Sequence, residues 1–208
     1  AYLAPTTRSL SHTRARSRAT EAGARGATMP GITETVLTAG LDADYDAVAA
    51  ACERIHEAVR GAAEIRITAP AGTDLTVEPG DRPWQLDTGL VREPGAFSNL
   101  PAGETFVSPV SADGVVVVDG TMGPHGLVPE PIRIEVTDGL VTEVSDPAVR
   151  EALATAAETV GDAAYNVAEL GIGANVGATD LVGSGLLDEK AAGTVHLAGG
   201  GAPCSRGR

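Results

Sequence analysis

The chain of 208 residues has few cysteines, few aromatic residues and a single lysine, Lys190. Its two cysteines, Cys52 and Cys204, have neither the paired spacing of a zinc site nor the number needed for a disulfide framework, which is consistent with a reducing cytosol. Aromatic residues make up 3% of the chain, so the core must be built from Ala, Val, Leu and Ile. No apolar run approaches the roughly 18 residues that a membrane span needs, and we expect a soluble, cytoplasmic protein.

Basic residues are concentrated at the two ends of the chain. The net charge is −13 overall, but residues 1–28 carry +4 and the last eight carry +2, so residues 29–200 carry −19. Such an acidic surface repels phosphate backbones and argues against a nucleic-acid partner. It is typical of halophilic proteins, whose salt-rich cytoplasm screens self-repulsion. GC-rich coding, which favours arginine over lysine, is a second and partial explanation.

The composition of the two ends predicts the domain organisation. Residues 1–28 are rich in arginine and have no apolar periodicity, which predicts a disordered extension, with Met29 as a plausible start of the natural protein. Residues 29–200 are expected to form a single α+β domain that represents part of a catalytic domain. Residues 201–208, "GAPCSRGR", are expected to be a tail.

Apolar periodicity and turn signals predict an α+β fold with a mixed or mostly antiparallel sheet flanked by helices. The stretch "PIRIEVTDGLVTEVSD" predicts a hairpin that turns at Asp138-Gly139. The run Val115–Val118 is apolar on both faces and predicts a buried central strand. Beyond residue 165 many glycines interrupt short apolar pieces, and we expect no long regular element there. The other predicted elements are helices over residues 42–62 and 147–163, capped by Asp42 or Asp44 and by Asp146, and strands over 64–69, 73–79, 104–110 and 114–122.

Two glycine-rich motifs carry little functional information. "GIGANVG" lacks the strand–turn–helix context and the downstream acid of a dinucleotide-binding site. Ser184 in "GSGLL" does not match the G-x-S-x-G pattern of a serine hydrolase.

Two carboxylates and one histidine lie in unusual local settings. Glu104 follows the turn "NLPAG", Glu169 lies in the apolar segment "NVAELGIG", and His196 lies among small apolar residues in "GTVHLAGG". Considered singly, each has an ordinary structural explanation, namely a solvated turn residue, a strand-end acid that faces water and a core histidine. Together they form a ligand set that suits Zn, Co, Mn or Fe, and such a metal would activate water for hydrolysis. Asp188 and Glu189 are candidates to orient His196 without binding the metal, or are solvated loop residues.

Four segments in order resemble the aminopeptidase T/S (leucyl aminopeptidase) family of metallo-aminopeptidases. They are "TDLTVEPGDRPWQLDTG", "NLPAGETFVSP", "AELGIGAN" and "LLDEKAAGTVHLAGG". The resemblance implies metal ligation by Glu104, Glu169 and His196, with two divalent ions (Zn, Co or Mn) that remove N-terminal residues from a peptide substrate. It also implies a possible homodimer.

The chain departs from this family after His196. The family continues with a tyrosine and a His-x-Asp pair, which this chain lacks, so we expect a C-terminal truncation, an incomplete metal site and little peptidase turnover. "DEKAAGTVHLA" fits equally well a second resemblance, to the 2,5-dihydroxypyridine ring-cleaving dioxygenases. That family implies a single iron(II) on His196, with neither glutamate as a primary ligand. A non-catalytic remnant is the third alternative.

Overall fold

A computed structural model describes residues 1–11 and 13–200 of the chain. The predicted α+β class is confirmed, because 27% of the chain is helical and 34% is in mostly antiparallel strands. The predicted tail, 201–208, lies outside the described residues. Where the sequence predicts one domain over residues 29–200, the chain divides into two compact units. Unit 1 contains Ala1–Ala58, Leu86–Thr105 and Ile172–Thr194, and unit 2 contains Val59–Gln85, Phe106–Gly171 and the described residues from Val195 onward.

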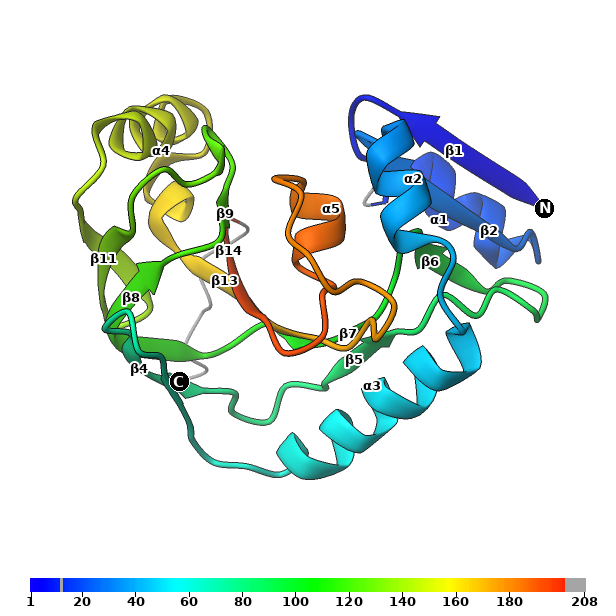
Figure 1. The fold of residues 1–208 in the computed structure, drawn as a ribbon, viewed down its shortest axis with the longest axis horizontal. Coiled ribbons are helices and arrows are strands. Elements are labelled where there is room, and N and C mark those ends of the chain that lie inside the picture. Colours follow the sequence, from blue (N-terminus) through cyan, green and yellow to red (C-terminus); the bar gives the residue numbers. More distant parts are fainter. Residues whose placement is uncertain (12, 201–208) are drawn as a thin grey trace. The chain divides into compact units, whose positions relative to one another are not determined.

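Unit 1 is built on a three-stranded parallel sheet of order β1-β2-β6. Figure 1 shows α1 and α2 beside its strands β1 and β2. Two apolar clusters form the core of the unit, one around Leu187 and one around Val48 and Cys52. The elements of unit 1 are β1 (Tyr2–Thr6), α1 (Arg14–Glu21), β2 (Gly26–Pro30), α2 (Glu34–Gly40), α3 (Tyr45–Val59, which ends one residue beyond the unit), β6 (Phe97–Asn99) and α5 (Gly185–Asp188).

The N-terminal segment forms regular structure where the sequence predicts a disordered extension. Residues 1–28 contain β1, α1 and the start of β2. A buried polar network joins them to β6, because the Ser11 hydroxyl lies 2.8 Å from that of Thr28 and both donate to the Asn99 side-chain oxygen at 2.7 Å. Parallel pairing and polar contacts of this kind leave little apolar periodicity in the sequence.

Unit 2 contains a five-stranded antiparallel sheet of order β12-β11-β8-β4-β3. The predicted hairpin at Asp138-Gly139 is confirmed as β11 and β12. The prediction for Val115–Val118 is confirmed in part, because β8 is central in the sheet but these valines are only half-buried. The elements are β3 (Ile65–Thr68), β4 (Asp74–Glu78), β8 (Ser111–Val118), β9 (Thr121–Met122), β10 (Gly126–Leu127), β11 (Ile132–Thr137), β12 (Leu140–Val144), α4 (Pro147–Val160), the 3-10 helix η1 (Gly161–Tyr165) and β14 (Val195–Gly199).

Local capping signals account for the two longest helices. Asp146 accepts a hydrogen bond from the Val149 backbone N–H at the start of α4, with Pro147 in its first turn as predicted. Asp44 caps α3 in the same way, by accepting from the N–H of Asp46 and Ala47. None of the helices in the described ranges combines the length and apolar character needed to span a lipid bilayer.

A four-stranded sheet of order β14-β13-β7-β5 carries the residues of interest. Its other strands, β5 (Gln85–Asp87), β7 (Glu104–Val107) and β13 (Val167–Gly173), each contain residues assigned to both units. The sequence predicts no long regular element after residue 165, and the seven-residue strand β13 shows that this prediction is wrong there. The glycines of β13 obscure its strand pattern, because they are placed where other groups come close.

Cys52 should be unreactive in the folded protein. Its side chain is fully buried, and burial followed by the nearby Asp87 raises the pKa of the thiol to about 11, from an ordinary value of 9.0. At pH 8 this leaves about 100-fold less of the nucleophilic thiolate. We expect the Cys204→Ser variant to react with a disulfide reagent at least that much more slowly when folded than in urea. Equal rates in the two states would contradict the buried position.

Candidate metal centre

Glu104 begins β7, and a tightly packed turn precedes it. Gly103 has φ +126°, and a Cβ there would lie 2.7 Å from the Cβ of Asn175, so no larger residue fits. The fully buried Asn175 donates from Nδ2 to the Ala102 carbonyl at 2.7 Å, and the Ala174 N–H donates to the Gly103 carbonyl at 2.8 Å. The backbone that presents Glu104 is therefore fixed on both sides within unit 1.

Lys190 contacts the carboxylate of Glu104. Its Nζ donates to Glu104 Oε1 and to Glu189 Oε1, each at 2.6 Å, and its side chain is 1% exposed. Glu104 is 6% exposed and Glu189 is 33% exposed, so the bond to Glu104 is the more deeply buried of the two. Because lysine side chains normally lie at the protein surface, the sequence did not identify Lys190 as part of the candidate site. Its one signal was its status as the only lysine in the chain.

The ionic surroundings keep Lys190 charged. Burial opposes the charge, but the carboxylates of Glu104, Glu189 and Asp87 outweigh it and raise the pKa of Lys190 above its usual value. Asp87 is also buried, and that burial raises the pKa of its carboxyl group although Lys190 and a hydrogen bond from the Ser98 hydroxyl act in the opposite direction. Unit 1 therefore contains a buried cation surrounded by acidic side chains.

Glu169 and His196 form a second ionisable pair, within unit 2. They lie on adjacent strands, β13 and β14, with 3.3 Å between His196 Nε2 and Glu169 Oε1, and their side chains are 15% and 30% exposed, respectively. Gly171 makes room for the imidazole, because a Cβ at that position would lie 2.1 Å from His196 Cε1. Gly171, the first glycine in "AELGIG", is thus required to make room for the ring of His196.

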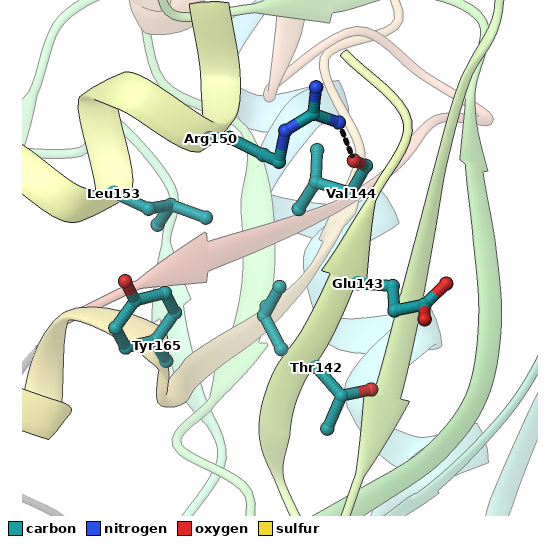
Figure 2. Close-up of a pocket in the computed structure, with 7 residues that line it drawn as sticks. Thr142, Glu143, Val144, Arg150, Leu153 and Tyr165 are labelled. Carbon is teal, nitrogen blue, oxygen red and sulfur yellow. Dashed lines mark hydrogen bonds between the residues drawn. The ribbon is translucent and has the colours of Figure 1, made fainter. Parts of the chain in front are cut away.

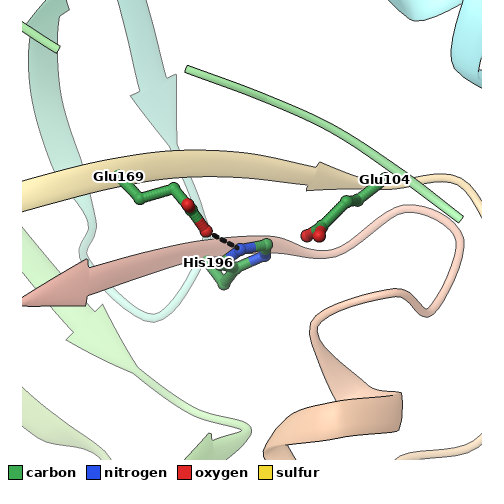
Figure 3. Close-up of side chains that lie close together, drawn as sticks. All are labelled: Glu104, Glu169 and His196. Carbon is green, nitrogen blue, oxygen red and sulfur yellow. Dashed lines mark hydrogen bonds and ion pairs between the residues drawn. The ribbon is translucent and has the colours of Figure 1, made fainter. Parts of the chain in front are cut away.

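The three residues predicted as metal ligands belong to different units, and each offers one atom that can bind a metal. Glu104 begins β7 in unit 1, whereas Glu169 and His196 lie on β13 and β14 in unit 2, where Figure 3 shows the Glu169 carboxylate directed toward the imidazole of His196. Two carboxylates and one imidazole suit a divalent transition metal, so this donor set fits the metal that the sequence predicts. Their role as ligands stays a prediction.

Asp188 and Glu189 were predicted to orient His196. The Asp188 carboxylate accepts hydrogen bonds from three successive backbone N–H groups, those of residues 182–184, at 2.8–3.1 Å. Glu189 accepts from Lys190. These contacts give Asp188 a role in shaping its loop and Glu189 a role in holding Lys190, and their action on His196 stays a prediction.

A separate pocket of about 540 Å³ lies in unit 2, between β12, α4 and η1 (Figure 2). The Arg150 guanidinium is its one cationic group, and it donates to the backbone carbonyls of Val144 and Ser145. The charge of Arg150 is therefore used to join α4 to β12. None of the predicted site residues lines this pocket; its lining consists of Val141, Thr142, Glu143, Val144, Arg150, Leu153 and Tyr165.

Comparison with known proteins decides between the two resemblances seen in the sequence. The family model NicX, 2,5-dihydroxypyridine 5,6-dioxygenase, matches residues 5–191. The chain belongs to this dioxygenase family. Members of the 2,5-dihydroxypyridine dioxygenase family bind a metal, which agrees with the donor set of Glu104, Glu169 and His196. No curated protein sequence gives a significant match.

Solved structures show the same fold. The chain is similar to 2,5-dihydroxypyridine dioxygenase from Pseudomonas putida KT2440, with a TM-score of 0.75 and 21% identity over 99% of this chain. It spans 62% of the length of that dioxygenase. It is also similar to wild-type AmpT from Thermus thermophilus, with a TM-score of 0.55 and 24% identity over 78% of this chain and 43% of that one.

The family match corrects the main functional prediction. The identification as an aminopeptidase T/S enzyme is wrong, and so are the hydrolase and protease classes that followed from it. The dioxygenase alternative is the one that the family match supports. Since the dioxygenase and AmpT structures both share this fold, the four sequence segments define turns and strands of a common scaffold and do not specify the reaction.

Proposed function

We propose that this chain is the greater part of a ring-cleaving dioxygenase that acts on 2,5-dihydroxypyridine or a closely related dihydroxylated heterocycle. The observation that carries the proposal is the dioxygenase family match over residues 5–191. The partly buried Glu169–His196 pair supports it, because a histidine that binds a metal usually contacts a carboxylate through its other ring nitrogen. Because the chain spans 62% of the solved dioxygenase, the activity of the whole protein is part of the proposal.

Iron(II) is the metal that fits this reaction. Imidazole and carboxylate ligands suit iron, and bound iron supplies the redox chemistry that lets dioxygen react with an aromatic ring. In this proposal His196 is a protein ligand of the iron. In this proposal Glu169 accepts a hydrogen bond from Nε2 of His196, and Nδ1 would be the ring nitrogen that binds the metal.

The remaining ionisable groups serve the organic substrate. A dihydroxypyridine must lose a hydroxyl proton when it becomes an electron-rich anion, and a carboxylate at the site is the natural acceptor. Glu104 supplies such a carboxylate on a rigid turn. Its contact with Lys190 keeps the local charge from becoming so negative that it would repel the anionic ring.

Removal of His196 tests the proposed function. We expect wild-type protein loaded anaerobically with iron(II) to consume dioxygen when 2,5-dihydroxypyridine is added, with loss of the ring's ultraviolet absorption. The His196→Ala variant should retain less than about a tenth of the bound iron and show no dioxygen uptake. His56→Ala is the matched control, since it removes an imidazole from α3 in unit 1.

Two results would contradict the proposal. One is iron retention and ring cleavage by His196→Ala at wild-type levels. The other is wild-type protein that binds iron with His196 but leaves 2,5-dihydroxypyridine intact, which would mean that the metal serves another substrate.

The predicted homodimer stays a prediction, and light scattering of the purified chain would test it.

A further inference from the structure

Lys190 is the largest fully buried side chain in the described part of the chain and also its only lysine. Elsewhere the chain uses arginine for its cations, and ion pairs such as Arg66–Asp74 lie at the surface, with side chains 64% and 56% exposed. A buried lysine costs free energy unless its charge is matched. Its burial at 1% exposure beside Glu104 therefore points to a specific role.

Both partners of the Lys190–Glu104 bond are held by backbone contacts within unit 1. The Asn175 N–H donates to the Lys190 carbonyl at 2.8 Å, and the Lys190 N–H donates to the Leu187 carbonyl at 2.9 Å. The side chain of the same Asn175 binds the Ala102 carbonyl, two residues before Glu104. Asn175 thus fixes the spacing between the lysine and the turn that presents the glutamate.

We propose that Lys190 is a positioning residue, which holds Glu104 Oε1 so that Glu104 serves as the proton acceptor for the substrate instead of turning to chelate the metal through both oxygens. The inference rests on the proposed function, because it assumes that Glu104 faces the metal or its substrate. Chelation by both oxygens of Glu104 would take up a position on the metal that dioxygen and the organic substrate need. Lys190 prevents it by binding Oε1 at 2.6 Å.

The chemistry of the ammonium group explains why lysine occupies this position in an arginine-rich chain. The ammonium is a compact charge with three donors, and here it reaches carboxylates on two separate segments, Glu104 and Glu189. A guanidinium is planar and larger, and it favours bidentate binding of a single carboxylate. Lys190→Arg should therefore preserve the charge without preserving the geometry.

The single lysine makes the bond directly measurable. Protein labelled with lysine carrying ¹⁵N at Nζ should give one ammonium signal, and slow proton exchange should keep it visible, because Lys190 is buried in hydrogen bonds. We expect Glu104→Gln to shift that signal strongly. Asp74→Asn, which breaks the exposed Arg66–Asp74 pair in unit 2, is the control and should leave the signal in place.

Metal binding supplies the second measurement. With Co²⁺ as the probe, Lys190→Met should strengthen metal affinity by about 10-fold or more, because it frees Glu104 to chelate and removes a neighbouring positive charge, and it should change the visible absorption of bound Co²⁺. Lys190→Arg should keep the charge and change the absorption with a smaller effect on affinity. Unchanged affinity and spectrum in Lys190→Met, while Glu104→Ala alters both, would overturn the positioning role. An ammonium signal that exchanges quickly and ignores Glu104→Gln would overturn it as well.

The two measurements separate this inference from the proposed function. If the ammonium signal depends on Glu104 and the Co²⁺ spectrum depends on Lys190, but 2,5-dihydroxypyridine is not cleaved, the proposed substrate fails and the role of Lys190 stands. If ring cleavage occurs and is unaffected by Lys190→Met, the dioxygenase function stands and the role of Lys190 is disproved.

Discussion

Replacement of Lys190 by methionine should lower the free energy of unfolding by about 3–5 kcal/mol, because it leaves the buried carboxylate of Glu104 without its ammonium partner. The two side chains are 1% and 6% exposed, so water cannot compensate for the lost bond at 2.6 Å. Urea unfolding followed by circular dichroism measures the change. The slope of the transition should stay constant if only stability is altered.

A double variant separates charge from packing in this prediction. Glu104→Gln combined with Lys190→Met removes both charges and should recover most of the lost stability, because a neutral buried amide costs less than an unpaired carboxylate. Arg66→Met, which breaks the exposed pair with Asp74, should change stability by less than about 1 kcal/mol. Wild-type stability in Lys190→Met would show that Glu104 does not depend on the ammonium.

The regular elements that could be predicted from the sequence are those with strong local signals. The helices α3 and α4 have an apolar stripe and an aspartate at the N-terminal cap, and the β11–β12 hairpin has an Asp-Gly turn. These features act over a few residues, and a single sequence displays them directly. For that reason the α+β class was also predicted correctly.

The elements that were missed depend on partners distant in the chain. Strand β1 pairs in parallel with β2, and β2 with β6, about seventy residues later. Strand β13 contains glycines at the positions where His196 and the Ala191 carbonyl approach its backbone. In the sequence alone such glycines indicate a loop, and only the tertiary contacts show that they make room for closely packed groups.

Local sequence signals also account for the choice of candidate metal ligands. Glu104, Glu169 and His196 were noticed because charged or imidazole groups in apolar segments need partners, and their role as ligands stays a prediction. Lys190 lies in the polar run "DEK", where nothing local indicates burial. The reaction was misassigned because the residues that shape a fold do not define its chemistry, and the family match over 5–191 was needed to correct it.

A methyl group added at Gly171 should displace the imidazole of His196. The Cβ of an alanine at this position would lie 2.1 Å from Cε1 and 2.4 Å from Nε2 of His196, far inside normal contact distance. Both residues lie in unit 2, on the adjacent strands β13 and β14, so the backbone has little freedom to move apart. The ring must rotate away from Glu169, and we expect metal affinity to fall by at least about 10-fold in Gly171→Ala.

Titration with Co²⁺ measures this effect, and urea unfolding accompanies it because overpacking alone costs about 1–3 kcal/mol. Gly185→Ala is the matched control, since a Cβ at Gly185 meets no atom within 4 Å and should leave both quantities unchanged. The double variant Gly171→Ala/His196→Ala removes the obstructing ring. It should regain the stability that Gly171→Ala loses while still failing to bind metal, because the clash is relieved but the imidazole is gone. If Gly171→Ala instead binds Co²⁺ as tightly as wild type, metal binding does not depend on the ring position of His196 seen in the structure.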